Sequence, residues 1–278
     1  MPMKLSLSVR VAEKFTDKRQ RSMNLDQLAQ LARQHRYHAL CMRASQLGTH
    51  TPLDTVRGER ATLNEQDLAV SMVTGDFPIP ENTEEGTAAL RNITPYLDLA
   101  QALGSDLLRI CMKKEEDITW AQRAADEAAE RGLRLAHQCH NASLFEQVEP
   151  SVEVLQRIGR NNFGIIYEPA NLELCGEEYG RSAIERLAPY MFNVYLQNQR
   201  IEESGPDTMH TWSRGPINFT QIPIWDEDGI DFPHILSTLE SIGYEGYVTI
   251  HQASAQLGTE AAVEQSSRYL RGLAAFMD

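Results

Sequence analysis

Side chains that could transfer protons, bind anions or ligate metals follow five short apolar runs of this sequence. They are Arg43, then His137, Gln138, His140 and Asn141, then Glu168 and Asn171, then Gln197, and finally His251. Histidine suits proton transfer because its ordinary pKa of about 6.5 lies near working pH. Arg109 lies inside another apolar run, over residues 107–112, where an inward guanidinium must meet an anion or a carboxylate. Gathered at one place, these groups would serve acid–base chemistry on a small molecule.

Eight apolar runs alternate with amphipathic segments along the chain. As strands, these runs would bring the polar side chains that follow them to one place. The runs cover residues 5–9, 38–42, 68–73, 107–112, 133–136, 164–167, 192–196 and 247–250. Helical patterns lie between them, including one that begins after the N-cap Asn24 and a long one over residues 84–103 closed by Gly104. This alternation predicts an α/β fold, a (β/α)8 TIM barrel, as a single domain over residues 1–278.

In a TIM barrel the carboxyl ends of the strands form one mouth, which carries the chemistry. The ends of the predicted strands include Arg43, Asp76, Glu168 and His251, whereas the strand starts show no comparable cluster. The alternative architecture is a doubly wound open sheet. That fold usually has a glycine-rich phosphate loop after its first strand, and residues 9–12 contain no glycine.

A long polar excursion, from Arg200 to Asp228, follows the seventh run. Segments of this length in a compact domain usually carry function or small local elements. Arg214 and His210 lie here and are candidate substrate-binding residues, together with Arg43, Arg109 and Gln197.

Composition narrows the class of protein. The chain has 278 residues and a formal net charge of −13, which argues against nucleic-acid binding because phosphate backbones are held by clustered Lys and Arg. No stretch is long and apolar enough for a membrane span, and no secretory signal is visible, so we expect a cytoplasmic protein without a membrane partner. The four cysteines are widely spaced without a CxxC pair and are expected to be free buried thiols.

The order of strand ends resembles the xylose-isomerase-like TIM-barrel superfamily, the sugar phosphate isomerase/epimerase group. The most specific segments are residues 96–104, residues 132–136, and the stretch Gly229-Ile230-Asp231-Phe232 followed by Gly243-Tyr244-Glu245-Gly246. The resemblance implies a small carbohydrate-like substrate and a homo-oligomer. It also implies one divalent metal, held in the family by Glu, Asp, His and Glu at four strand ends. The matching positions here are Gln138, Glu168, Tyr195 and His251, so only Glu168 keeps a carboxylate.

Two accounts of the site follow. In the first, Glu168 and His251 bind a divalent ion together with Gln138, His140 or Gln197, and such a mixed N/O set suits Zn²⁺, Mn²⁺ or Fe²⁺ better than Mg²⁺. In the second, no metal is bound, and Glu168, His140 and His251 act directly as acid–base groups while Arg109 and Arg214 stabilise an enediolate-like anion. The first is favoured, because two or three credible ligands remain.

The leading functional hypothesis is a sugar or polyol isomerase or epimerase that removes a proton next to a carbonyl. A lyase or dehydratase acting on a keto-sugar or cyclitol begins with the same carbanion and is the first alternative. A barrel that has lost the metal site and only binds a partner is the second. The endonuclease branch of the superfamily is disfavoured by the net charge of −13 and by the small number of metal ligands.

Overall fold

Eight parallel strands close into a barrel in the computed structural model, which describes residues 2–14, 17–75, 84–253 and 257–278. The barrel strands are β1 (Lys4–Ser8), β4 (Ala39–Met42), β5 (Ala69–Thr74), β6 (Leu107–Ile110), β7 (Arg134–Gln138), β8 (Phe163–Tyr167), β9 (Met191–Leu196) and β13 (Tyr247–Ile250). Each coincides with one of the eight apolar runs. The predicted (β/α)8 TIM barrel is therefore confirmed.

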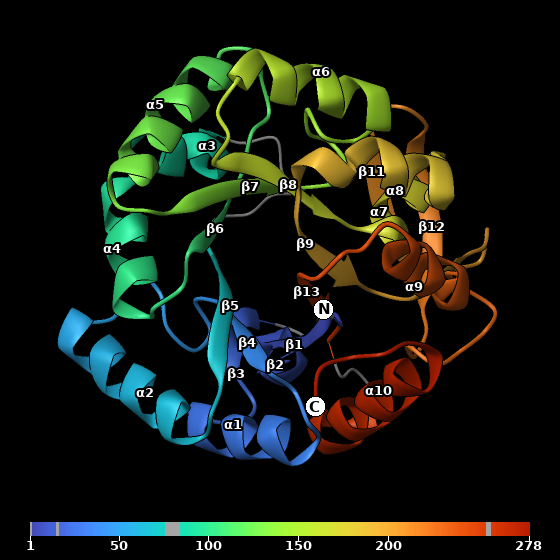
Figure 1. Ribbon diagram of the computed structural model, residues 1–278. Helices are drawn as coiled ribbons and strands as arrows, with labels where there is room; N and C mark the ends of the chain where they lie inside the picture. The colour runs from blue at the N-terminus through green and yellow to red at the C-terminus, as the bar shows by residue number, and fades with distance from the viewer. Residues whose placement is uncertain (1, 15–16, 76–83, 254–256) are drawn as a thin grey trace.

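Helices surround the barrel as a ring (Figure 1). They are α1 (Leu25–Gln34), α2 (Leu53–Glu65), α3 (Glu84–Arg91), α4 (Thr94–Ala102), α5 (Asp117–Glu130), α6 (Val148–Ile158), α7 (Pro169–Leu174), α8 (Arg181–Leu187), α9 (Phe232–Ser241) and α10 (Thr259–Leu273). The short 3₁₀ helices η1 (Val9–Ala12) and η2 (Ala188–Tyr190) complete them. Asn24 caps α1 as expected, since its side chain accepts a hydrogen bond from the main-chain N–H of Gln27.

The single helix expected over residues 84–103 is wrong. The segment forms two helices, α3 and α4, separated by Asn92 and Ile93. Pro95 lies in the first turn of α4, a position that proline favours because its missing N–H has no partner there in any case. The same proline cannot continue a helix from the N-terminal side, which explains the break.

The polar excursion after β9 contains a small antiparallel sheet rather than an irregular loop. Its strands are β10 (Gln199–Ile201), β11 (Asp207–Thr211) and β12 (Gly215–Gln221), in the order β10-β12-β11. A second pair, β2 (Glu13–Lys14) and β3 (Asp17–Arg21), follows β1 and η1. Both additions extend from carboxyl ends of barrel strands, where the site is expected.

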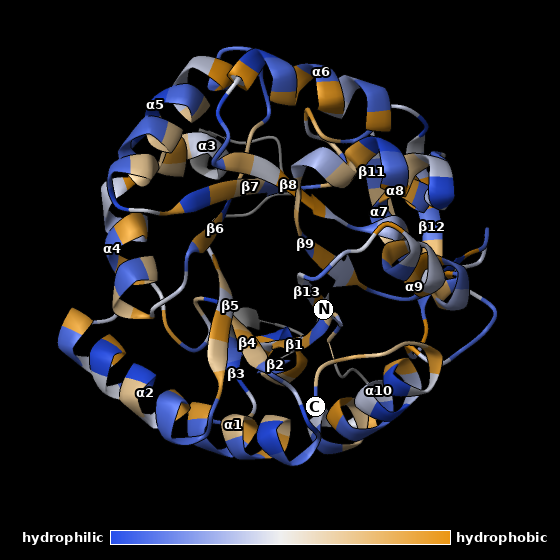
Figure 2. Cartoon of the chain, in the orientation of Figure 1, coloured by the Kyte–Doolittle hydropathy of each residue, from blue (hydrophilic) through white to orange (hydrophobic). Residues whose placement is uncertain are grey.

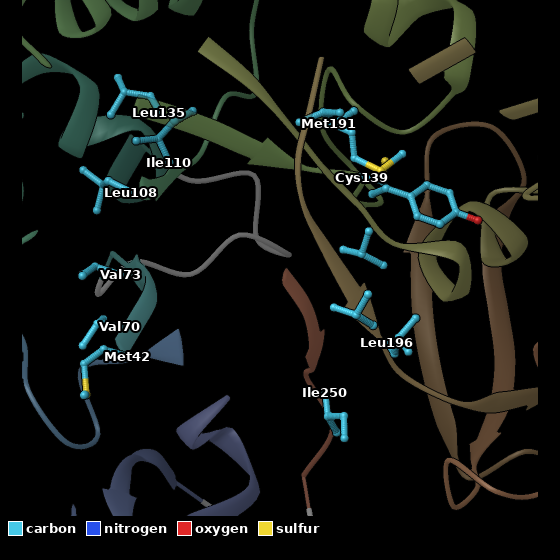
Figure 3. Packing of buried hydrophobic residues seen from close by; sticks show 14 of the residues in the cluster. Met42, Val70, Val73, Leu108, Ile110, Leu135, Cys139, Met191, Leu196 and Ile250 are labelled. Carbon is cyan, nitrogen blue, oxygen red and sulfur yellow. The ribbon is translucent and has the colours of Figure 1, made fainter. Parts of the chain in front are cut away.

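The main apolar core lies between the barrel strands and the helices. Figure 3 shows part of it, with Leu108 and Ile110 from β6 beside Leu135 from β7, and Figure 2 shows hydrophobic and hydrophilic residues alternating along α4, α5 and α6. All four cysteines are buried free thiols, as predicted. Within the described residues, no helix has the length and apolar character needed to cross a membrane.

Candidate active site

The inward faces of the strands determine which side chains reach the mouth. A second, smaller apolar cluster fills the barrel interior and consists of Cys41, Met72, Leu107, Ala136, Ile166 and Tyr195. Because side chains alternate between the two faces of a strand, residues two positions further along face the same way. Five candidate residues stand at such positions: Arg43, Arg109, Gln138, Glu168 and Gln197. The strand pattern therefore brings these five side chains to one mouth.

Glu168 lies at the centre of this group and is fully buried. Its Oε2 atom accepts hydrogen bonds from Gln138 Nε2 and, at 2.8 Å, from Asn171 Nδ2, while its Oε1 atom accepts one from Gln197 Nε2. Gln138 and Gln197 come from the strands on either side of β8, and Asn171 lies one turn along α7. A carboxylate offers about four acceptor positions, so about one remains for a ligand.

Burial changes the acidity of this carboxyl group. Removal from water raises the pKa of Glu168 from 4.5 to about 7, against the lowering effects of the Gln197 hydrogen bond and of the Arg109 and Arg10 charges. A side chain whose pKa is near neutral can both accept and return a proton under working conditions. Glu168 therefore has the acidity expected of a catalytic base.

Arg10 is a residue of the site that sequence reasoning missed. Its Nη1 atom donates to Gln197 Oε1 at 2.9 Å and to the main-chain oxygen of His251 at 3.4 Å. Desolvation, with the nearby Arg43 charge, lowers the pKa of Arg10 to about 10, so it remains a cation at neutral pH. Its position could have indicated this role, because Arg10 stands two residues after Ser8, the last residue of β1. The 3₁₀ helix η1 begins directly after Ser8, so the end of the strand is hard to recognise in the sequence.

Arg109 and Arg43 provide two further guanidinium groups. Arg43 Nε donates to Glu13 Oε1 at 2.6 Å, and the same oxygen accepts from Ser45 Oγ at 2.9 Å. Arg109 is only 6% exposed, and its Nε atom has no hydrogen-bond partner within the described part of the chain. Burial lowers its pKa as well. Arg43 is thus neutralised within the protein, whereas Arg109 has unfilled donor capacity.

The two predicted catalytic histidines are both buried. The His251 ring stacks on Tyr195, with ring centres 3.9 Å apart, and its Nδ1 atom lies 3.1 Å from Ser8 Oγ. Burial and the Arg109 charge hold the pKa of His140 well below 6.5, so that His140 is a neutral imidazole near pH 7. His140 Nδ1 lies 2.9 Å from the main-chain oxygen of Asn141.

His210 and Arg214 lie apart from this group, on the hairpin formed by β11 and β12, and both are exposed. Arg214 Nη1 is 3.5 Å from the main-chain oxygen of Glu173 and 3.4 Å from that of Leu174, at the end of α7. The main-chain oxygen of His210 accepts from Asn141 Nδ2 at 2.8 Å. These bonds fasten the hairpin to the loops after β7 and β8, and the structure does not bring either side chain into hydrogen-bond contact with Glu168. Asp76 lies outside the described residues.

Comparison with known proteins identifies the family. The family model of the xylose isomerase-like TIM barrel matches residues 26–273. The chain belongs to this family. No curated protein sequence matches it.

Solved structures of the xylose isomerase-like TIM-barrel family share the fold at low sequence identity. The probable 3-DHS dehydratase AsbF from Bacillus anthracis superposes with a TM-score of 0.74 at 14% identity, covering 97% of this chain and 99% of that one. D-psicose 3-epimerase, solved in the presence of D-fructose, gives 0.67 at 13%, covering 98% and 93%. A protein of this fold from Mycobacterium smegmatis in complex with magnesium gives 0.68 at 12%, covering 98% and 96%.

The predicted metal ligands of this family member are Glu168, Gln138 and His251. The described residues contain no group of three or more His, Cys, Asp or Glu side chains placed to hold a metal ion. Amide N–H groups, rather than oxygens, face Glu168, and Gln197 is held in this orientation because its oxygen accepts from Arg10, which can only donate. A divalent cation needs lone-pair donors, such as carboxylate or amide oxygens or imidazole nitrogens, and nearby guanidiniums repel it. The residues as arranged do not fit a divalent metal.

Proposed function

We propose that this protein is an isomerase or epimerase that moves a proton next to the carbonyl group of a small polyol-like substrate, with Glu168 as the base. Keto-sugars, sugar acids and cyclitols are the candidate substrate classes. The observation that carries the proposal is the fully buried Glu168 carboxyl, with its pKa raised to about 7, among inward polar side chains at the barrel mouth. This places a proton acceptor of suitable strength where TIM-barrel enzymes carry out chemistry.

The neighbouring groups support the chemistry that follows proton removal. Loss of the proton leaves negative charge on the carbonyl oxygen of the substrate. Arg10 and Arg109, whose charges act on Glu168, are proposed to stabilise that charge. Arg109 is assigned to substrate contact. His251, which directly follows β13, is proposed to donate a solvent-derived proton to the carbanion from another side, while the proton taken by Glu168 exchanges with water. Neutral His140 supplies a hydrogen bond rather than a charge.

The other candidate residues are assigned to positioning. Gln197 connects Arg10 to Glu168, and Gln138 donates to Glu168 from the other side. Arg43 is paired with Glu13. His210 and Arg214 lie on the hairpin, whose bonds to α7 and to Asn141 hold the loop that carries His140. We propose that they shape the mouth rather than react.

A dehydratase is the second candidate, because a structure with one of the higher TM-scores is a probable 3-DHS dehydratase. Elimination begins with the same proton removal by Glu168 and then expels a hydroxyl group from the neighbouring carbon as water. The residues of the site serve either outcome, so the products must be analysed to separate them.

Proton exchange in D₂O tests the proposal. Keto-sugars, keto-acids and inososes are incubated with the protein and followed by NMR. We expect deuterium next to the carbonyl without loss of water, and at least a hundredfold slower exchange in Glu168→Gln. Glu153→Gln, at an exposed position on α6, is the matched control and should exchange like the wild type. Loss of water would indicate the dehydratase, and unchanged exchange in Glu168→Gln would exclude Glu168 as the base.

A further inference from the structure

The buried Arg109 guanidinium has donor capacity that the protein does not satisfy. The side chain is 6% exposed and its Nε atom has no hydrogen-bond partner within the described residues. The other two guanidiniums of the mouth differ, since Arg10 donates to Gln197 and Arg43 to Glu13. A buried charge without hydrogen-bond partners is unfavourable, so a ligand that supplies acceptors here would gain binding energy.

The charges around Arg109 favour a negative ligand. Arg10, Arg43 and Arg109 lie close enough for each to act electrostatically on another. Among the described residues, the carboxylates that oppose them are Glu13, which is bonded to Arg43, and Glu168. Within this described part of the mouth, positive groups therefore outnumber negative ones, in a chain whose formal net charge is −13. This local excess of positive charge favours an anionic ligand.

The planar shape of the Arg109 guanidinium indicates which kind of anion it binds best. A guanidinium offers Nε and one Nη as two parallel donors, and a planar carboxylate accepts both at once. Arg109 stands two residues after Leu107 on β6 and so has the same inward register, on a strand two positions from β8 in the barrel. A substrate held by a carboxylate at Arg109 could present its reacting carbon to Glu168.

We infer that Arg109 binds a permanent carboxylate of the substrate, so that the substrate class is a sugar acid or oxo acid rather than a neutral sugar. This rests on the proposed function, because it concerns the same site. The carboxylate takes no part in the proton transfer. It anchors one end of the molecule, while Glu168 acts on a carbon next to the carbonyl group.

Calorimetry with three compounds on one skeleton tests this inference: D-glucuronate, D-glucose and D-glucose 6-phosphate, at low ionic strength. We expect D-glucuronate to bind at least tenfold more tightly than either other compound, and Arg109→Gln to remove that preference. Arg109→Lys keeps the charge but loses the two-point pairing, so it should retain only part of the preference. Arg160→Gln, at a half-buried surface position where the side chain pairs with Asp126, is the matched control and should behave like the wild type.

The contrary outcomes are distinct. Equal binding of D-glucuronate and D-glucose, no binding of any compound, or a preference that survives Arg109→Gln would overturn the inference. Tighter binding of D-glucose 6-phosphate would overturn the carboxylate assignment. Thermal unfolding of Arg109→Gln checks that the variant is folded, and removal of an unpaired buried charge should not lower its melting temperature. Because binding is measured without turnover, a carboxylate preference without exchange in D₂O would refute the proposed function alone.

Discussion

At the scale of single residues, the amides around Glu168 decide what the site can do. Three side-chain amides donate to one carboxylate, and Arg10 fixes the orientation of Gln197. The amides hold the carboxylate in place but leave it buried enough for its pKa to rise to about 7. Where the resemblance to the family implies metal ligands, this chain therefore has a buried carboxyl group, with a pKa of about 7, held by amides and acted on by the charges of Arg10 and Arg109.

The raised pKa predicts a pH-dependent stability. The folded protein holds the Glu168 proton up to about pH 7, whereas the ordinary value is 4.5. Between these values the folded state binds more protons than the unfolded state, so the free energy of unfolding should fall as pH rises. The contribution is fully present below about pH 4.5 and is lost through about pH 7, and it amounts to about 3 kcal/mol.

Denaturant unfolding of wild type and Glu168→Gln at pH 5 and pH 8 measures this effect. The variant should lose less stability between the two values. Circular dichroism checks that the variant is folded, because a new amide N–H at either oxygen position faces the donor of Asn171 or of Gln197. Glu153→Gln is the control, and the same pH slope in all three proteins would refute the prediction.

The rate of proton exchange should also depend on Glu168, but it should rise with pH over the range in which the free energy of unfolding falls. The base must be deprotonated to act, so the rate of exchange should rise with pH and level off above about pH 7. A rate that is flat from pH 5 to pH 8 would contradict the role of Glu168.

The donor chemistry around Glu168 also predicts the response to chelators. Because amide N–H groups face the carboxylate and two guanidiniums act on it, exchange by protein treated with EDTA should equal that of untreated protein. Added Mn²⁺ should not raise the melting temperature. If EDTA abolished exchange and added Mn²⁺ restored it, the metal-bound account of the site would be supported instead.

At the scale of elements, the hairpin of β11 and β12 is held down by one buried glutamate. Glu146 accepts from the main-chain N–H of Trp212 at 3.0 Å, from that of Ser213 at 3.1 Å, and from Ser213 Oγ at 3.0 Å. It also accepts from the N–H of Ala142, in the loop that follows β7. One carboxylate thus joins the hairpin tip to the loop that carries His140.

Removal of this connection should loosen both segments. Glu146→Ala leaves three main-chain N–H donors without their acceptor, while Ser213 Oγ can still donate to the main-chain oxygen of Cys175, and we expect a loss of about 2 to 4 kcal/mol in the free energy of unfolding. Amide hydrogen exchange should accelerate at Trp212, Ser213 and Ala142, while β6 keeps its protection. Glu153→Ala, on the adjacent α6, is the control. Equal protection of the hairpin in both variants would show that Glu146 does not hold it.

The sequence predicts the barrel better than it predicts these additions. Apolar runs mark the eight strands because both faces of each strand are covered, as the burial of all four residues of β6 shows. Residues 13–21 are mostly charged and residues 207–221 alternate only weakly, so neither antiparallel unit has a clear strand pattern. Strand ends likewise reveal Glu168 and Gln138, but not that Gln138, Asn171 and Gln197 bond to one carboxylate, which depends on strand order and on the inward face.

At the scale of the whole molecule, the net charge opposes folding while the mouth remains cationic. Carboxylates exceed basic groups by 13, and their mutual repulsion lowers stability at neutral pH. Surface ion pairs such as Arg160–Asp126 and Arg186–Glu149 offset little of this, because exposed pairs are worth at most about 1 kcal/mol each. Screening of the excess negative charge by added salt should therefore raise the stability of the folded protein.

Salt should raise the melting temperature at pH 8 but not near the isoelectric point of about 5.1. At pH 8, raising NaCl from about 0.02 to 0.2 M shortens the screening length from roughly 20 Å to below 10 Å, which removes most of the long-range repulsion. A gain of about 1 kcal/mol corresponds to about 2 to 4 °C for a chain of this size. Near pH 5.1 the repulsion is absent and only the ion pairs weaken, so the melting temperature should stay constant or fall. A melting temperature that falls with salt at pH 8 would show that the ion pairs, not the net charge, govern the electrostatic stability.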